Sequence, residues 1–141
     1  MSDGKGRGQP GEERHVLGLP EMDEQHRYLY GLFDRIEQSR QVTDRQATKT
    51  LLAEIERYVV FHFACEEHLM RAYEAPGFAV HQSDHETASA KLVQFMDDFD
   101  AGRLNPAALR IYLTGWLMEH SATSDAAYAA WILERRRGIP G

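Results

Sequence analysis

Two pairs of residues in this sequence have the types and the spacing needed to bind a metal ion. They are His62 with Glu66 and His81 with His85. Residues four apart lie only about 40° apart around an α-helix, so both side chains of each pair point the same way. Each pair lies on the apolar side of a helical pattern, where a charged or polar group is costly unless it is paired or bound to a metal.

Two more histidines, His26 and His120, lie on the apolar stripes of two further helical patterns. One histidine on such a stripe is usually a buried side chain with a hydrogen-bond partner rather than a ligand. Here all four patterns carry an inward histidine, and this joint occurrence indicates that the helices converge on metal. His15, in the N-terminal segment, and His68, which is off the face of Glu66, are not expected to take part.

The ligand types indicate more than one ion. Imidazole nitrogen suits Zn, Cu, Fe and Ni, whereas structural zinc usually takes four ligands and often cysteine. Five inward histidines and at least one carboxylate exceed a single tetrahedral site. The residues alone therefore predict a histidine-rich centre of two metal ions, and they leave the metal open.

Four helical patterns carry these residues, with inward side chains at steps of three and four. The first begins near Pro20, a residue favoured in the first turn of a helix, and ends before Thr43. Thr43 with Gln46 resembles a capping box at the start of the second pattern, which Pro76-Gly77 ends.

The other two patterns have similar boundary signals. The third ends near Gly102, a residue suited to a helix C-cap, and the fourth begins at Asn105-Pro106, an N-cap followed by proline. The fourth continues to Ala127 and Trp131, which we expect to face inward. Four helices of roughly 20 to 30 residues with short loops predict an all-α, up-down-up-down antiparallel four-helix bundle.

Composition excludes several function classes. The 141 residues fit one domain, which we place at residues 15–137 after a disordered, glycine-rich tail at 1–14. A net charge of −6 argues against nucleic acid. No apolar run reaches the ~20 residues of a membrane span, and the N-terminus lacks the apolar core of a secretory signal. The single cysteine, Cys65, cannot form an intrachain disulfide, so we expect a cytoplasmic monomer that binds neither nucleic acid nor membrane.

The stretches around these residues resemble the hemerythrin family. The matching segments are MDEQHRYLYGLFDRI, HFACEEHLM, HQSDH and WLMEHSATSD, in that order within residues 18–131. The resemblance implies two iron ions (Fe2+/Fe3+) joined by an oxo or hydroxo bridge. It also implies seven ligands: His26 and His62 on one iron, His81, His85 and His120 on the other, and Glu66 and Asp125 bridging both. Only the resemblance selects Asp125, because five residues after His120 correspond to about 140° around an ideal helix and require a local distortion.

The function that the resemblance implies is reversible O2 binding, for storage, delivery or sensing. O2 enters the open position on the five-coordinate iron of His26 and His62, both irons pass from Fe(II) to Fe(III), and oxygen is held as hydroperoxide. The implied partners are O2 and an oxygen-consuming enzyme or a signalling protein. The positions matching the family's O2 pocket are Leu29, Phe63, Trp116, Leu117 and Ser121.

Two departures from the family pattern concern this pocket: Ser121 replaces a large apolar residue, and Ala88 replaces a phenylalanine. The Ser121 hydroxyl is expected either to face the pocket or to bond back to a helix carbonyl. The alternative functions are a di-iron oxidase or peroxidase and an NO or O2 scavenger. Di-iron oxidases typically use paired Glu-x-x-His motifs. The sequence has only one, from Glu12 to His15 in the tail, so we expect a binding protein and no enzyme.

Overall fold

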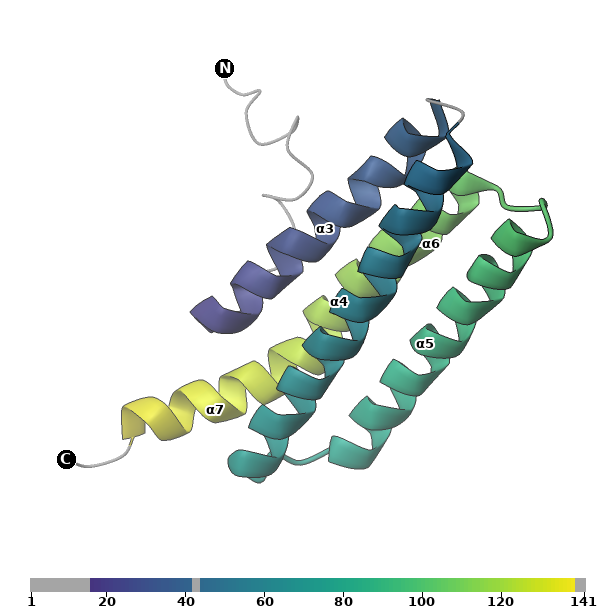
Figure 1. The fold of residues 1–141 in the computed structure, drawn as a ribbon. Coiled ribbons are helices and arrows are strands. Elements are labelled where there is room, and N and C mark those ends of the chain that lie inside the picture. Colours follow the sequence, from purple (N-terminus) through teal and green to yellow (C-terminus); the bar gives the residue numbers. More distant parts are fainter. Residues whose placement is uncertain (1–15, 42–43, 139–141) are drawn as a thin grey trace, which may run out of the picture.

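A computed structural model describes residues 16–41 and 44–138 of the chain. Within these ranges it contains four helical rods and no β-strand (Figure 1). The rods are α3 (Pro20–Gln41), α4 (Arg45–Ala72), α5 (Phe78–Asp100), and a fourth in which α6 (Pro106–His120), the π-helical turn η1 (Ser121–Asp125) and α7 (Ala126–Gly138) follow without a break. The predicted all-α four-helix bundle is confirmed. The predicted tail at 1–14 lies outside the described residues.

Consecutive rods run antiparallel, as the short connections predict (Figure 1). Helix α3 packs against both α4 and α6, and α4 packs against α5. Each rod therefore presents one face to the interior, where the inward residues of the sequence pattern meet. No helix among the described residues is long and apolar enough to cross a membrane.

The helix ends follow the sequence signals with one exception. Asn105 caps α6 as predicted, with Pro106 in the first turn. At the start of α4, however, Asp44 is the N-cap and accepts two backbone N–H groups of the first turn. The predicted cap at Thr43 is wrong, and Thr43 itself lies outside the described residues. An aspartate suits the position because its negative charge also complements the helix dipole.

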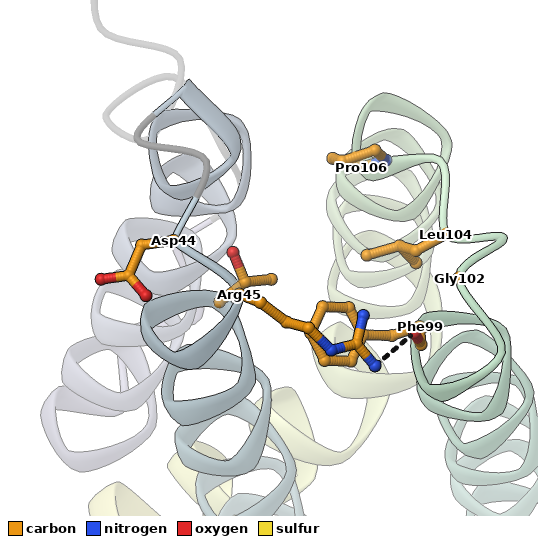
Figure 2. A pocket seen from close by; sticks show the side chains of 7 residues that line it. Asp44, Arg45, Phe99, Gly102, Leu104 and Pro106 are labelled. Atoms are coloured by element: carbon orange, nitrogen blue, oxygen red, sulfur yellow. Dashed lines mark hydrogen bonds between the residues drawn. The ribbon is translucent and has the colours of Figure 1, made fainter.

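Arg45 connects the start of α4 to the end of α5 (Figure 2). Its guanidinium donates to the carbonyl oxygen of Phe99 at 3.2 Å and lies 4.3 Å from the centre of the Phe99 ring. Carbonyl groups in the last turn of a helix lack partners within it. The Phe99 carbonyl oxygen accepts from the backbone N–H of Gly102, at 3.0 Å, as well as from this guanidinium. Gly102, with φ +77°, follows the last turn of α5, as predicted. The open cavity beside Arg45, about 280 Å³, has no histidine among its described lining residues.

The buried apolar side chains form two clusters, separated along the bundle. The larger contains Leu29, Val59, Leu92 and Leu117 among others, and the smaller contains Leu19, Met22, Met70, Tyr128 and Ile132 among others. On each rod the predicted ligands lie at the boundary between the two clusters in sequence. On α4, for example, His62 and Glu66 fall between Val59 and Met70. A layer of buried polar residues thus divides the core.

The π-helical turn changes which residues of the fourth rod face inward. Such a turn takes in one residue more than an α-turn, so the residues after it are shifted by one position. Ala127 is exposed and Trp131 is half-buried, while their neighbours Tyr128 and Ile132 are buried. The predicted inward position of Ala127 is therefore wrong, because the pattern assumes an unbroken α-helix.

Asp23 holds the segment that leads into α3. Its carboxylate oxygens accept hydrogen bonds from the backbone N–H groups of Leu17, at 2.8 Å, and Gly18, at 3.0 Å. Gly18 has φ +89°, a conformation that residues with a side chain rarely adopt. A Cβ at this position would lie only 3.2 Å from Cδ1 of Leu133 in α7. The turn therefore requires glycine for both its conformation and the space.

We expect Gly18→Ala to lower the free energy of unfolding by roughly 1–2 kcal/mol, because of the positive φ and the close contact. Gly31→Ala is the matched control. Gly31 lies in α3, and a Cβ added there would meet nothing within 4 Å, so alanine should stabilise the helix by roughly 0.5–1 kcal/mol. Thermal melting of both variants measures the two effects, and shifts of the same sign would contradict this account of the turn.

Candidate metal centre

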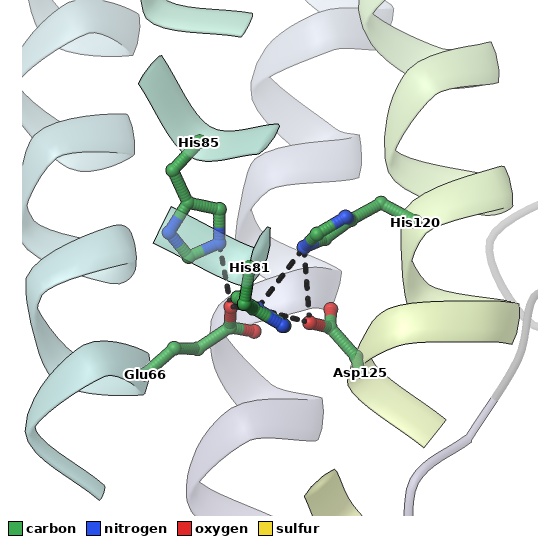
Figure 3. A group of neighbouring side chains, drawn as sticks. All are labelled: Glu66, His81, His85, His120 and Asp125. Atoms are coloured by element: carbon green, nitrogen blue, oxygen red, sulfur yellow. Dashed lines mark hydrogen bonds and ion pairs between the residues drawn. The ribbon is translucent and has the colours of Figure 1, made fainter. Parts of the chain in front are cut away.

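Five histidines and two carboxylates from all four rods meet in the polar layer, and Figure 3 shows five of these residues. Their donor atoms form two overlapping groups, each within 4.8 Å. The three-histidine group is Glu66, His81, His85, His120 and Asp125, and the two-histidine group is His26, His62, Glu66 and Asp125. All seven side chains are buried. Cys65 belongs to neither group.

Glu66 presents one carboxylate oxygen to each group. Its Oε1 lies 3.1 Å from Nε2 of His81 and 3.0 Å from Nε2 of His85. Its Oε2 lies 3.1 Å from Nε2 of His62 and 3.4 Å from Nε2 of His26. This is the placement that a carboxylate bridging two ions needs.

Asp125 mirrors this arrangement from the fourth rod. Its Oδ1 lies 3.1 Å from Nε2 of His81 and 3.2 Å from Nε2 of His120, and its Oδ2 lies 3.3 Å from Nε2 of His26. An ideal α-helix would direct Asp125 away from His120, but the turn between them is π-helical. The wider turn brings residue i+5 back to the side of residue i. The local distortion expected between these two residues is therefore present.

The centre contains buried polar atoms that a cation would satisfy. Both Asp125 oxygens are buried and make no hydrogen bond of acceptable geometry with any described residue, although three imidazoles surround them. The Nε2 atoms of His26 and His62 are 3.1 Å apart, as are those of His81 and His120. Lone pairs at that separation repel each other unless a proton or a metal ion lies between them. A set of imidazole nitrogens and carboxylate oxygens fits iron among the transition metals.

Without a cation, the carboxylates hold protons on the imidazoles. Burial lowers the pKa of His26, but the adjacent Asp125 and Glu66 outweigh this and raise it to about 9. The same opposing effects raise the pKa of His81 to about 9. Burial alone would raise the pKa of Glu66, but His62, His26 and His81 hold it well below its usual value. Metal binding at neutral pH must therefore displace protons.

Aromatic rings cover the three-histidine group. The ring of Phe63 stacks on His85 with centroids 3.8 Å apart and planes within 4°. The ring of Trp116 stacks on His120 at 4.4 Å and 14°. These contacts restrict rotation of both imidazoles and keep water from their faces.

A small apolar cavity lies within the larger apolar cluster. Leu29, Phe63, Trp116 and Leu117 line it, and so does Ala88. Its volume is about 20 Å³, which leaves room for roughly one small molecule. The expected fifth pocket residue, Ser121, is not among its lining residues.

Ser121 lies behind a predicted ligand instead. It is fully buried, and its Oγ is 3.4 Å from Nδ1 of His26, the ring nitrogen that points away from the centre. Neither position expected for this hydroxyl, facing the pocket or bonded to a helix carbonyl, matches that contact. Ser121 directly follows His120, so its side chain points about 100° to one side of that ligand, toward His26 of α3.

Sequence reasoning missed the residues that contact the outer edges of the imidazoles. Gln25 Oε1 lies 2.7 Å from Nδ1 of His62, and Glu67 Oε2 lies 2.9 Å from Nδ1 of His85. Both directly adjoin a predicted ligand in the sequence and are therefore about 100° off its helix face. A search for shared helix faces passes over them. The only available signal was their adjacency to the ligands.

Tyr128 is a second residue that the sequence pattern missed, because the pattern assumes no π-helical turn. Its ring centroid lies 5.4 Å from that of His81, and the side chain is buried. Burial and the charges of Glu66 and Asp125 raise the pKa of its hydroxyl, so the group stays protonated beside the centre.

Comparisons with known proteins agree with this geometry. Residues 17–132 match the family model described as the hemerythrin HHE cation binding domain. The chain is 30% identical to a bacteriohemerythrin of Stenotrophomonas maltophilia, over 80% of this chain and 74% of that protein. It is 26% identical to one of Pseudomonas aeruginosa (79% and 72%) and 25% identical to one of Methylococcus capsulatus (75% and 82%). No solved structure matches the chain significantly.

The metal-free protein should lose stability as the pH rises from 6.5 to about 9. The folded-state pKa values of His26 and His81 are about 9, against 6.5 for an unperturbed histidine, so the folded state binds more protons in that interval. Their stabilisation is complete below pH 6.5 and is lost as the pH rises through 9. Each group contributes at most about 1.4 kcal/mol per pH unit.

Thermal melting of the metal-free and metal-loaded proteins across this pH range tests the prediction. The metal-loaded protein is the control, because its imidazoles have already lost these protons and its melting temperature should depend less on pH. A metal-free protein whose melting temperature rises toward pH 9 would contradict the assignment of the protons to this centre.

Proposed function

This chain belongs to the hemerythrin family, and we propose that it binds O2 reversibly at a centre of two iron ions. The observation that carries the proposal is the pair of overlapping donor groups. Glu66 and Asp125 each place one carboxylate oxygen in one group and the other oxygen in the second group. Two carboxylates in this position match two ions side by side. Seven donors are also too many for one ion of ordinary coordination number.

The two groups would give the two irons different numbers of nitrogen donors. His81, His85 and His120 offer three nitrogens to one iron, whereas His26 and His62 offer two to the other. With fewer protein donors, the two-histidine group would leave room for O2 on the ion that it holds. When bound, the two irons supply the electrons that reversible O2 binding needs. The protein holds the donors in place and excludes water.

The apolar cavity is the place we propose for incoming O2. Its lining includes Leu29, three residues after His26, and also Phe63 and Trp116, whose rings stack on His85 and His120, so the cavity lies close to both donor groups. Its lining residues are all apolar and offer nothing that would hold a water molecule in competition with O2.

The donor set favours binding over oxidation chemistry. Di-iron carboxylate bundles draw a glutamate from each of two helices and a Glu-x-x-His motif from each of the others. Here two carboxylates and five imidazoles make up the centre. We therefore propose an O2-binding protein and no enzyme. Storage, delivery to an oxygen-consuming enzyme and sensing through a signalling partner all use this binding step.

The direct test is metal analysis and optical spectroscopy of protein reconstituted with Fe(II) under anaerobic conditions. We expect two irons per chain and a visible absorption change that appears with O2 and disappears under argon over repeated cycles. One zinc per chain with no iron would reject the proposal. Sustained turnover with peroxide, without reversible spectral change, would favour an oxidase or peroxidase instead.

A matched pair of histidine variants on α4 tests the site itself. His62 is buried in the two-histidine group, whereas His68, six residues later, is exposed and belongs to neither group. His62→Ala should lower the iron content below two per chain and abolish the reversible spectral change. His68→Ala should leave both unchanged. Equal iron content in the two variants would exclude His62 as a ligand.

A matched pair of alanine variants on α5 tests the cavity. Ala88 lines it, and Ala90 is exposed on the same helix. Ala88→Val should slow O2 association, because the added methyl groups fill free volume, while both irons remain. Ala90→Val should bind O2 at the unchanged rate. Stopped-flow mixing with O2 gives both rates, and equal rates would show that O2 does not use this cavity.

A further inference from the structure

Four polar residues, each beside a predicted ligand in the sequence, contact a histidine on the next rod. Gln25 of α3 lies 2.7 Å from His62 of α4, Glu67 of α4 lies 2.9 Å from His85 of α5, Asp84 of α5 lies 3.9 Å from His120 of α6, and Ser121 of η1 lies 3.4 Å from His26 of α3. Every contact is to Nδ1, the nitrogen that faces away from the centre. The contacts pass once around the bundle and close on themselves, so we call Gln25, Glu67, Asp84 and Ser121 the supporting ring.

The helix directions explain why the ring closes. A residue next to a ligand points about 100° to one side of it, toward a neighbouring helix. Gln25 and Asp84 precede their ligands on α3 and α5, whereas Glu67 and Ser121 follow theirs on α4 and at the end of α6. Neighbouring rods run in opposite directions. The residue before a ligand on one rod and the residue after a ligand on the next rod therefore point the same way around the bundle.

The supporting ring favours imidazoles that carry a proton on Nδ1. A histidine that binds metal through Nε2 must carry its proton on Nδ1, and an acceptor at Nδ1 selects that form. Oxygen atoms of the supporting ring face Nδ1 of His26, His62, His85 and His120.

The charges of the supporting ring are unevenly distributed. The three-histidine group faces the two carboxylates, Glu67 and Asp84, whereas the two-histidine group faces the neutral Gln25 and Ser121. A carboxylate that accepts the imidazole proton makes the ring a stronger donor and stabilises the higher charge of a ferric ion. Neutral acceptors do this less.

We propose that Glu67 lowers the reduction potential of the iron in the three-histidine group, so that this iron is oxidised before the iron of the two-histidine group. This inference rests on the proposed di-iron function. Each step converts one Fe(II) to Fe(III), and its electron passes to a one-electron oxidant such as ferricyanide, which becomes ferrocyanide. The iron with the open position is then the one that stays ferrous longer.

Distance and exposure make Glu67 the stronger of the two carboxylates. Its Oε2 lies 2.9 Å from Nδ1 of His85, its side chain is 17% exposed, and Gln82 donates to its other oxygen at 3.3 Å. Asp84 is 3.9 Å from His120 and 44% exposed, so water and salt screen its charge more effectively. Glu67 is therefore the residue to change first.

Glu67→Gln removes the charge and keeps the shape and an acceptor oxygen. The iron-loaded protein is titrated stepwise with ferricyanide at one fixed pH, and electron paramagnetic resonance follows the mixed-valence form. We expect two one-electron potentials, with the first raised in Glu67→Gln, so that less mixed-valence form accumulates at the midpoint. Gln25→Glu places a carboxylate on His62 and should lower the second potential instead. Iron content is measured for each protein.

Glu86→Gln is the matched control. Glu86 lines the same surface depression as Glu67 and is exposed, so this variant removes the same charge nearby. Its potentials should equal those of the unaltered protein. The proposal is overturned by an unchanged first potential in Glu67→Gln with two irons bound, or by an equal shift in Glu86→Gln.

The remaining outcomes are also decisive. Where Glu67→Gln fails to hold two irons, Gln25→Glu decides, because an unchanged second potential overturns the proposal and a lowered one supports it. An unaltered protein that does not hold two irons would reject the proposed function itself, which keeps the two failures distinguishable.

Discussion

The burial of two carboxylates at the middle of a helical bundle is the constraint on which the rest of the structure depends. Glu66 and Asp125 are both inaccessible to solvent, and a charge in that position is very costly unless opposite charge surrounds it. Every rod places at least one imidazole beside these carboxylates. The consequence for packing is a core divided in two, because the polar layer interrupts the apolar stripe of each rod at the same level.

How much the sequence predicts depends on whether the helices are regular. The pairs His62 with Glu66 and His81 with His85 are accessible from spacing, because α4 and α5 are regular α-helices through them. Asp125 is not, because a π-helical turn brings it inward, and only the resemblance selects it. The same turn explains the error at Ala127.

Residues that face sideways are harder to predict than residues that face inward. Helical periodicity identifies a face, and a side chain one position away from a ligand is off that face by construction. By periodicity alone, Glu67 resembles half of an ordinary solvated pair with Glu66, although it contacts His85. The resemblance assigns Ser121 to the O2 pocket, whereas its hydroxyl lies against His26. Both cases require the neighbouring helix, which the sequence of one helix does not describe.

The π-helical turn also links two properties that are usually free to vary separately in evolution. Substitutions that straighten residues 121–125 into regular α-helix, at unchanged length, would move the aspartate off the centre. The same straightening would rotate everything that follows by about 100°, so Tyr128 and Ile132 would leave the smaller cluster. A lineage could not abandon the bridging ligand by this route and retain a well-packed C-terminal helix. Selection for a stable fold would therefore help to preserve the turn even where selection on the metal had relaxed.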